Sequence, residues 1–271
     1  MYYCKKNKMT LNFSEKNILI GGSTDGIGWE CAKLFSSLGG NVTLISRDIN
    51  KLEKRRSELI NNGSQNHNIV ALDYTNPELV EKSLSVFITQ NKLKFDIVIN
   101  NTGGPPGGLL HEANSQELLN AFNMHLVSFH KILGLTVDDM KNQPHGRIIN
   151  IISTSVKQPL NGLGVSNTIR GAVANWSKTL ANELGQFNIT VNNILPGATN
   201  TGRLNEIISA KANKLNKDQS EIADQMANEV PMKRIAEPIE VANAVVFLAS
   251  EMASYINGVN LPVDGGRTKS L

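Results

Sequence analysis

A short apolar run that breaks into glycines is the feature that most constrains this chain. Residues 17–28 read Asn-Ile-Leu-Ile-Gly-Gly-Ser-Thr-Asp-Gly-Ile-Gly, and a helical pattern follows them. In a strand-turn-helix unit, Gly22 permits a tight turn, Gly26 lets the backbone approach a pyrophosphate and Gly28 lets the helix lie close to the strand. Free N–H groups at the helix start favour phosphate oxygens. The stretch predicts a dinucleotide site, although a glycine-rich turn can also merely join two elements.

Apolar runs alternate with helical patterns along the whole chain. Strands are expected near residues 17–21, 41–46, 68–72, 95–100, 147–153, 189–195 and 259–263. Regular alternation predicts an α/β protein with a parallel, doubly wound sheet. Helix starts support this prediction, because Asn76-Pro77 places a capping residue before a proline and Pro238 opens the last long helix.

The length of the chain fits one domain. With 271 residues, of which 40% are hydrophobic, it can bury one substantial core. We expect an N-terminal extension over residues 1–11 and a dinucleotide-binding domain over residues 12–271. The polar, lysine-rich segment 199–237 is the long irregular stretch. It is expected to be either a substrate lid over the site or a plain surface insertion.

Charge and cysteine content argue against several classes of protein. The net charge of +3 comes from dispersed basic residues with one dense run at 51–56, so nucleic-acid binding is not expected. Cys4 and Cys31 are too few for a disulfide framework and lack the spacing of metal ligands, which indicates a reducing compartment. No apolar run reaches the length of a signal peptide or a membrane span. We therefore expect a cytoplasmic protein with no metal site and no membrane partner.

Residues after the second predicted strand bear on the choice of dinucleotide. An enzyme that uses NAD normally presents an acidic residue there to the ribose 2′-hydroxyl, whereas Ser46 and Arg47 suit the 2′-phosphate of NADP. Asp48 follows directly and is expected to face the start of the next helix. After the third strand, Asp73-Tyr74 can border the adenine, although an aspartate at a strand end is often only a turn or cap residue. We expect NADP rather than NAD.

Later motifs complete a pattern that resembles a known family. Asn100-Asn101-Thr102-Gly103 follows the fourth strand, Pro196-Gly197 follows the sixth, and Val263-Asp264-Gly265-Gly266 lies at the end. With the glycines of 21–28, these motifs resemble the short-chain dehydrogenase/reductase family over about residues 12–267, and within it the 3-oxoacyl-(acyl carrier protein) reductase-like members. The resemblance implies a single-domain, Rossmann-type sheet of about seven strands. The expected cofactor-binding residues are Gly22, Ser23, Thr24, Gly26, Ile27, Gly28, Ser46, Arg47, Asp73, Tyr74, Asn100, Asn101, Gly103, Arg170, Pro196, Gly197 and Thr199.

The catalytic residues that the resemblance implies are only partly present. In the family, a tyrosine exchanges the substrate proton, a lysine four residues later lowers its pKa and holds the nicotinamide ribose, and a serine binds the substrate oxygen. Counting back from the family-like helix at 176–184, the tyrosine and lysine positions fall on Ser166 and Arg170. The serine position falls on Ser153, with Ser155 as a second candidate.

The family's asparagine, which supports a proton relay, also has no direct counterpart. Its position falls on His125, while Asn123 would face elsewhere on a helix. An aliphatic hydroxyl is far less acidic than a phenol, so Ser166 is not expected to be the general acid. Arg170 stays cationic and can still hydrogen-bond a ribose or a phosphate. His125 has the intrinsic pKa of a proton donor, yet a lone histidine on a helix is more often structural.

Two functions from different classes remain open. The first is an NADP(H)-dependent oxidoreductase that interconverts a carbonyl and an alcohol, with His125 or a water held by Ser153 and Ser166 as the proton donor. The second is a dinucleotide-binding protein with little or no dehydrogenase activity. The expected partner is a small carbonyl or acyl substrate.

A homotetramer is expected as well, because the family commonly pairs the helix after the fifth strand with its copy. The pattern on that helix is compatible with such pairing. Ala174 and Ala181 would leave a small-residue face for a second helix. The apolar stripe expected to face the sheet consists of Val173, Trp176, Leu180 and Leu184.

Overall fold

Seven parallel strands form a single sheet in the order β3-β2-β1-β4-β5-β6-β7 in the computed structural model, which describes residues 11–270. The strands are β1 (Asn17–Ile20), β2 (Asn41–Ser46), β3 (Asn68–Ala71), β4 (Ile97–Asn100), β5 (Gly146–Ile151), β6 (Ile189–Pro196) and β7 (Asn260–Val263). Every predicted strand is confirmed. The order reverses between β1 and β4, so the carboxyl ends of these two strands border the crevice where ligands of such sheets bind.

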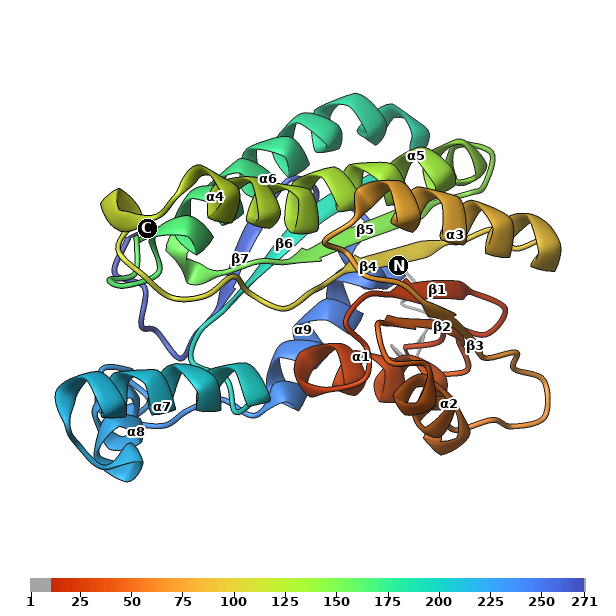
Figure 1. Cartoon of the computed structure of the whole chain (residues 1–271). Coiled ribbons are helices and arrows are strands. Elements are labelled where there is room, and N and C mark those ends of the chain that lie inside the picture. Colours follow the sequence, from red (N-terminus) through yellow and green to blue (C-terminus); the bar gives the residue numbers. More distant parts are fainter. Residues whose placement is uncertain (1–10, 271) are drawn as a thin grey trace, which may run out of the picture.

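Helices cover both faces of the sheet (Figure 1). On one face lie α3 (Pro77–Asn91), α5 (Ser128–Lys141) and α6 (Gly164–Leu184), and on the other lie α1 (Gly26–Ser37), α2 (Ile49–Glu58) and α9 (Pro238–Ala249). The shorter α4 (Ser115–Phe122) precedes α5, whereas α7 (Gly202–Leu215) and α8 (Gln219–Asn228) follow β6. In residues 11–270, no helix is both long enough and apolar enough to cross a bilayer.

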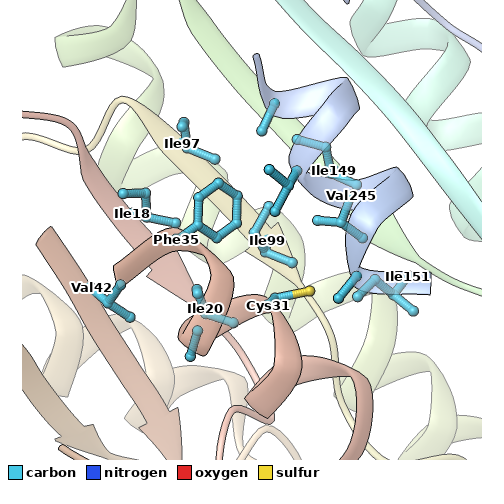
Figure 2. Close-up of a cluster of buried hydrophobic side chains, with 14 of the residues drawn as sticks. Ile18, Ile20, Cys31, Phe35, Val42, Ile97, Ile99, Ile149, Ile151 and Val245 are labelled. Atoms are coloured by element: carbon cyan, nitrogen blue, oxygen red, sulfur yellow. The ribbon is translucent and has the colours of Figure 1, made fainter. Parts of the chain in front are cut away.

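Burial on both faces explains why the strands read as continuous apolar runs. Figure 2 shows the cluster between the sheet and the α1/α9 layer, in which Phe35 and Cys31 of α1 meet Val245 of α9. The strands contribute alternate residues to this cluster, among them Ile18, Ile20, Ile97, Ile99, Ile149 and Ile151. The intervening residues, such as Leu19, Val98 and Ile148, pack against α3, α5 and α6 on the other face.

The predicted helix starts are confirmed. Asn76 accepts a hydrogen bond from the backbone N–H of Leu79 at 3.2 Å, and Pro77 occupies the first turn of α3. Pro238 begins α9, and the Glu240 side chain accepts a hydrogen bond from the backbone N–H of Glu237 at 2.8 Å. Local sequence therefore defines where these helices begin.

Leu11, at the end of the expected N-terminal extension, and the expected small-residue face of α6 both take part in the packing of the chain. Leu11 was expected in the N-terminal extension, but it packs against the α1/α9 core. The rest of that extension, including Cys4, lies outside the described residues. Ala174 and Ala181 of α6 were expected to be open to a second helix, but they are 6% and 3% exposed. The segment before β7 covers Ala181, because Asn257 donates a hydrogen bond to the Ala181 carbonyl oxygen at 2.8 Å. Ala174 belongs to the buried cluster between the sheet and α3, α5 and α6.

The remaining prediction for α6 is confirmed. Val173, Leu180 and Leu184 are buried against the sheet, and Trp176 packs partly against the same cluster. The indole N–H of Trp176 also reaches His130 of α5 at 3.4 Å. The helix is therefore held along its length, which sets the position of the residues in its first two turns.

Candidate active site

The turn after β1 requires glycine at three positions. Gly22 and Gly26 have φ angles of +53° and +52°, in the left-handed region that favours glycine. A Cβ added at Gly28 would lie 2.3 Å from the Gly22 carbonyl oxygen, because the helix start lies directly against the turn. The Asn101 side chain closes the turn from β4 by donating to the carbonyl oxygens of Gly21 and Gly22 at 3.1 and 3.3 Å. The result is a backbone cradle at the carboxyl end of β1.

Several side chains predicted to bind cofactor face inward instead. The Ser23 hydroxyl donates to the Ile45 carbonyl oxygen at 3.2 Å, and the Asn100 amide donates to the Asn150 side chain at 2.8 Å. Tyr74 is buried behind the turn, and burial raises the pKa of its phenol. These three side chains hold the cradle together, so only their backbone groups are left for a ligand.

The ends of β2 and β3 form a polar corner next to the cradle. The hydroxyls of Thr24 and Ser46 lie 3.2 Å apart, and the side chain of Arg47 is 76% exposed with its guanidinium 4.0 Å from Asp73. Asp48 faces the helix start as predicted, since it accepts from the backbone N–H of Lys51 at 3.0 Å. An exposed cation and two hydroxyls fit the 2′-phosphate of NADP better than the uncharged ribose hydroxyl of NAD.

The other predicted cofactor residues surround the same crevice. Asp73 takes the turn role that was left open, because it accepts from the Thr75 backbone N–H at 2.9 Å. Ile27 packs partly against the α1/α9 core, and Gly103 is exposed after β4. Pro196 ends β6, and the next two predicted residues are linked by a hydrogen bond from the Thr199 hydroxyl to the Gly197 carbonyl oxygen at 3.1 Å.

His125 lies in a distorted stretch of helix. The segment Asn123–Val127 between α4 and α5 is π-helical, a local widening that is frequent at functional sites. The His125 side chain is fully buried, and neither ring nitrogen has a hydrogen-bond partner among the described residues. Burial, and then the charge of Arg170, lower the pKa of His125 well below 6.5. The imidazole is therefore neutral at pH 7.

The first turns of α6 carry the other predicted catalytic positions. Ser166 and Arg170 are four residues apart and share a helix face. Arg170 is buried; its Nη1 donates to the Ile151 carbonyl oxygen at 3.0 Å, whereas its Nε has no partner in residues 11–270. Burial, and then the charge of Arg203, lower the pKa of Arg170 to about 10, so the guanidinium remains charged at pH 7.

The serines after β5 complete the cluster. Ser153 accepts from the Ser155 backbone N–H at 3.1 Å and so caps the short helical turn Thr154–Val156. The Ser155 hydroxyl is buried and has no partner within the described part of the chain. Helix α6, which carries Ser166 and Arg170, packs against both this turn and the π-helical segment that carries His125. His125 and Arg170 are close enough for the charge of Arg170 to act on the imidazole.

Arg203 is a site residue that the sequence reasoning missed. It lies in the first turn of α7 and donates through Nη2 to the Pro105 carbonyl oxygen at 2.5 Å and through Nη1 to Glu206 at 3.0 Å. A cation in the first turn of a helix is unfavourable, because it lies at the positive end of the helix dipole. The unusual position of Arg203 could therefore have indicated a functional role from sequence alone.

Segment 199–237 forms a small unit with its own apolar cluster. Its two ends are joined by a bridge between Thr199 and Ala236, with a hydrogen bond from the Ala236 N–H to the Ala198 carbonyl oxygen at 2.9 Å. The cluster consists of Leu204, Ile208, Ala212 and Ile222. A cavity of about 290 Å³ is bordered by the loop after β5, by Glu229 at the end of α8 and by the C-terminal residues 267–269. The described residues hold no group of three or more His, Cys, Asp or Glu side chains arranged for a metal ion.

Comparison with known proteins gives similarity over almost the full length. A family described as enoyl-(acyl carrier protein) reductase matches residues 22–268. The NADPH-dependent reductase BacG of Bacillus subtilis is 27% identical over 260 residues, which cover 95% of this chain and 100% of BacG. The 3-oxoacyl-[acyl-carrier-protein] reductase FabG of Vibrio cholerae is 30% identical over 258 residues, 94% of this chain and 98% of FabG. L-Sorbose reductase from Gluconobacter frateurii, solved in complex with NADPH and L-sorbose, has a TM-score of 0.90 at 30% identity and covers 97% of this chain and 100% of its own.

Proposed function

Because this chain belongs to the short-chain dehydrogenase/reductase family, we propose that it is an NADP(H)-dependent oxidoreductase that interconverts a carbonyl compound and an alcohol. The observation that carries the proposal is the corner of Thr24, Ser46 and Arg47 beside the glycine cradle. BacG, described as NADPH-dependent, and the sorbose reductase complexed with NADPH support this cofactor.

Different residues at the carboxyl ends of the strands would bind different parts of the cofactor. The backbone of Gly22 and Gly26 would face the pyrophosphate, and Arg47 would pair with the 2′-phosphate. Arg170, whose Nε is left without a partner among the described residues, would donate to the nicotinamide ribose. The cofactor, when bound, supplies a hydride to the carbonyl carbon.

The proton donor of this site is atypical. His125 is neutral at pH 7, so it is in the wrong protonation state to be the acid. We propose that a water held by the hydroxyls of Ser153 and Ser166 donates the proton to the substrate oxygen. The charge of Arg170 would stabilise the alkoxide and the hydroxide that the water becomes.

The direct test is NADPH binding followed by turnover. Binding is measured by the fluorescence of NADPH, and consumption is then measured with a panel of ketones and 3-oxoacyl thioesters. Binding with slow consumption of at least one carbonyl compound is the expected result. Absence of NADPH binding by the folded protein would contradict the proposal.

A second candidate is a dinucleotide-binding protein with little or no dehydrogenase activity. One observation favours it: Ser166 and the neutral His125 leave the surroundings of Arg170 without a group of suitable acidity. Tight NADPH binding with no consumption of any carbonyl compound would select this candidate.

Assembly and location are also proposed from the chain's own residues. The outer side of α4 exposes the apolar side chains of Leu119 and Phe122. His130 of α5 and Trp176 of α6 lie edge to face. These features support a homotetramer assembled through α4, α5 and α6. Light scattering at micromolar concentration tests the homotetramer, and a monomer would contradict it.

The free, buried Cys31 supports a reducing, cytoplasmic location. We also propose that segment 199–237 covers the substrate.

A further inference from the structure

Arg203 connects the segment 199–237 to the loop that follows β4. Its guanidinium lies against Gly104, where an added Cβ would come within 3.3 Å of Nε, and it donates to the carbonyl oxygen of Pro105. Its side chain is one third exposed, so the group lies at an edge of the site rather than in bulk solvent. A residue larger than glycine at position 104 would displace it. The loop and α7 together hold this cation in place.

Arg203 is also close enough to Arg170 for the two charges to repel. The charge of Arg203 adds to burial in lowering the pKa of Arg170. In residues 11–270, no carboxylate lies within ion-pair distance of Arg170, and the acid paired with Arg203 is Glu206, whose side chain is 69% exposed. An exposed pair of this kind is worth little and leaves most of the positive potential in place. Two cations are therefore held near each other, and the one carboxylate of the described residues that pairs with either of them is the exposed Glu206.

Further unsatisfied donors lie in the same cluster. The hydroxyl of Ser155 is more than nine-tenths buried and lacks a partner within the described residues. The Nε of Arg170 is equally buried and also lacks a protein partner, and it is the group that the nicotinamide ribose would meet. Buried polar groups without partners are costly unless a ligand or water meets them. The start of α7 adds the positive end of its dipole at Arg203.

We propose that Arg203, with Arg170 behind it, binds a carboxylate on the substrate, so that the carbonyl compound taken by this protein is an oxo acid. This inference rests on the proposed reductase function and names its substrate class. The planar guanidinium forms paired hydrogen bonds with a carboxylate, which lysine cannot reproduce. A neutral ketone, a sugar or a 3-oxoacyl thioester would leave the two charges uncompensated.

The pyrophosphate of the cofactor is the other possible source of the anion. The residues just before Arg203 approach the glycine turn, since a Cβ added at Gly26 would lie 3.0 Å from the methyl group of Thr201. The two sources make different predictions for cofactor affinity. A substrate carboxylate requires that loss of Arg203 leave dinucleotide binding nearly unchanged.

Calorimetry in the presence of saturating NADP⁺ tests the proposal without requiring turnover, because a ketone and the oxidised cofactor cannot react. The probes are levulinate and its methyl ester, which share the ketone and differ in the carboxylate, together with pyruvate and 2-oxoglutarate. The variants are Arg203→Gln and Arg203→Lys. The matched control is Lys211→Gln, which removes an exposed cation two turns further along α7.

The wild-type protein is expected to bind at least one oxo acid, and levulinate about tenfold more tightly than its ester, the equivalent of one charge-assisted hydrogen bond. Arg203→Gln removes this difference, Arg203→Lys keeps part of it, and Lys211→Gln leaves it unchanged. Equal affinity for acid and ester, no binding of any oxo acid at millimolar concentration, or an unaltered Arg203→Gln variant would overturn the inference. A tenfold loss of NADP⁺ affinity in Arg203→Gln, with oxo-acid binding unchanged, would also overturn the inference. In that case Arg203 would bind the pyrophosphate of the cofactor and not a substrate carboxylate. Failure of the folded wild-type protein to bind NADP⁺ would instead contradict the proposed function.

Discussion

His125 and Arg170 are buried close together beside the end of β5, and the guanidinium charge reinforces the effect of burial on the imidazole. The pKa of His125 is held well below 6.5, first by desolvation and then by Arg170. Arg170 is anchored to the Ile151 carbonyl oxygen, so this charge cannot move away. A histidine that the sequence offered as a possible acid is therefore kept neutral by burial first, and then by an arginine that stands where the family has a lysine.

This relationship predicts how stability depends on pH. In the unfolded chain His125 binds a proton near its ordinary pKa, whereas the folded protein keeps it neutral to much lower pH. The unfolded state therefore binds more protons below about pH 6.5, and stability falls with falling pH by about 1.4 kcal/mol per pH unit for this group. We expect His125→Asn to reduce that slope, measured by urea unfolding between pH 5 and pH 8.

Two other histidines serve as comparisons. His145 is partly buried and its pKa is also lowered, chiefly by burial and then by Lys16, so His145→Asn should remove a further part of the slope. His111 has an exposed side chain, so His111→Asn serves as the surface control. An identical slope in wild type and His125→Asn would mean that His125 is accessible to protons in the folded protein.

Ser166 and Arg170 stand where the family has a tyrosine and a lysine, and this difference predicts slow turnover. Restoring the family's two residues should raise the rate. Proton transfer by a positioned group contributes on the order of 10² to 10⁴ in rate. Ser166→Tyr with Arg170→Lys should therefore raise kcat for a reduced carbonyl compound by about 10² or more, measured by NADPH consumption. Thr168→Tyr, an exposed position on the same turn, is the control.

Rapid turnover that does not depend on Ser166 would refute the hypothesis that loss of the family's tyrosine weakens catalysis. If the unaltered protein turns over rapidly and Ser166→Ala remains as fast, the acid lies elsewhere. His125→Ala is then the next measurement, and loss of turnover with unchanged NADPH affinity would assign the proton to His125 despite its lowered pKa.

The corner at the ends of β2 and β3 predicts a preference for NADPH over NADH. Arg47→Asp places a carboxylate where the 2′-phosphate would lie, so it should weaken NADPH binding by at least about tenfold and leave NADH binding unchanged or improved. Calorimetry with both dinucleotides measures the effect. Arg56→Asp, on the exposed face of α2, should alter neither affinity. Equal or tighter binding of NADH by the wild-type protein would refute the preference.

Two Gly→Ala substitutions, one in the glycine cradle and one in α5, should change the stability of the protein in opposite directions. Gly28→Ala would place a methyl group 2.3 Å from the Gly22 carbonyl oxygen and should destabilise the fold by about 1–3 kcal/mol while it weakens NADPH binding. Gly134→Ala, in α5 with no atom near its added Cβ, should stabilise the protein by about 0.4–1 kcal/mol. Urea unfolding and NADPH fluorescence measure both. Tolerance of Gly28→Ala with full affinity would show that the cradle can rearrange.

Much of the fold and the cofactor edge could be read from local sequence. The strands, the start of α3 at Asn76-Pro77 and the turn at Gly22 and Gly26 depend on periodicity, capping and φ preferences of a few neighbouring residues. The same is true of Asp48, whose role as a helix cap needs only the next three residues. These features follow from short-range chemistry, so the sequence alone determined them.

The tertiary structure decided what the site side chains can do. Ser23 and Asn100 turn inward because β2 and β5 supply their partners, and Ala181 is covered by the segment before β7. Arg203 meets the Pro105 carbonyl oxygen across 98 residues of chain. Burial and charge at a site are sums over segments that are distant in sequence, so no local pattern could reveal that His125 is neutral or that the charge of Arg203 reaches Arg170.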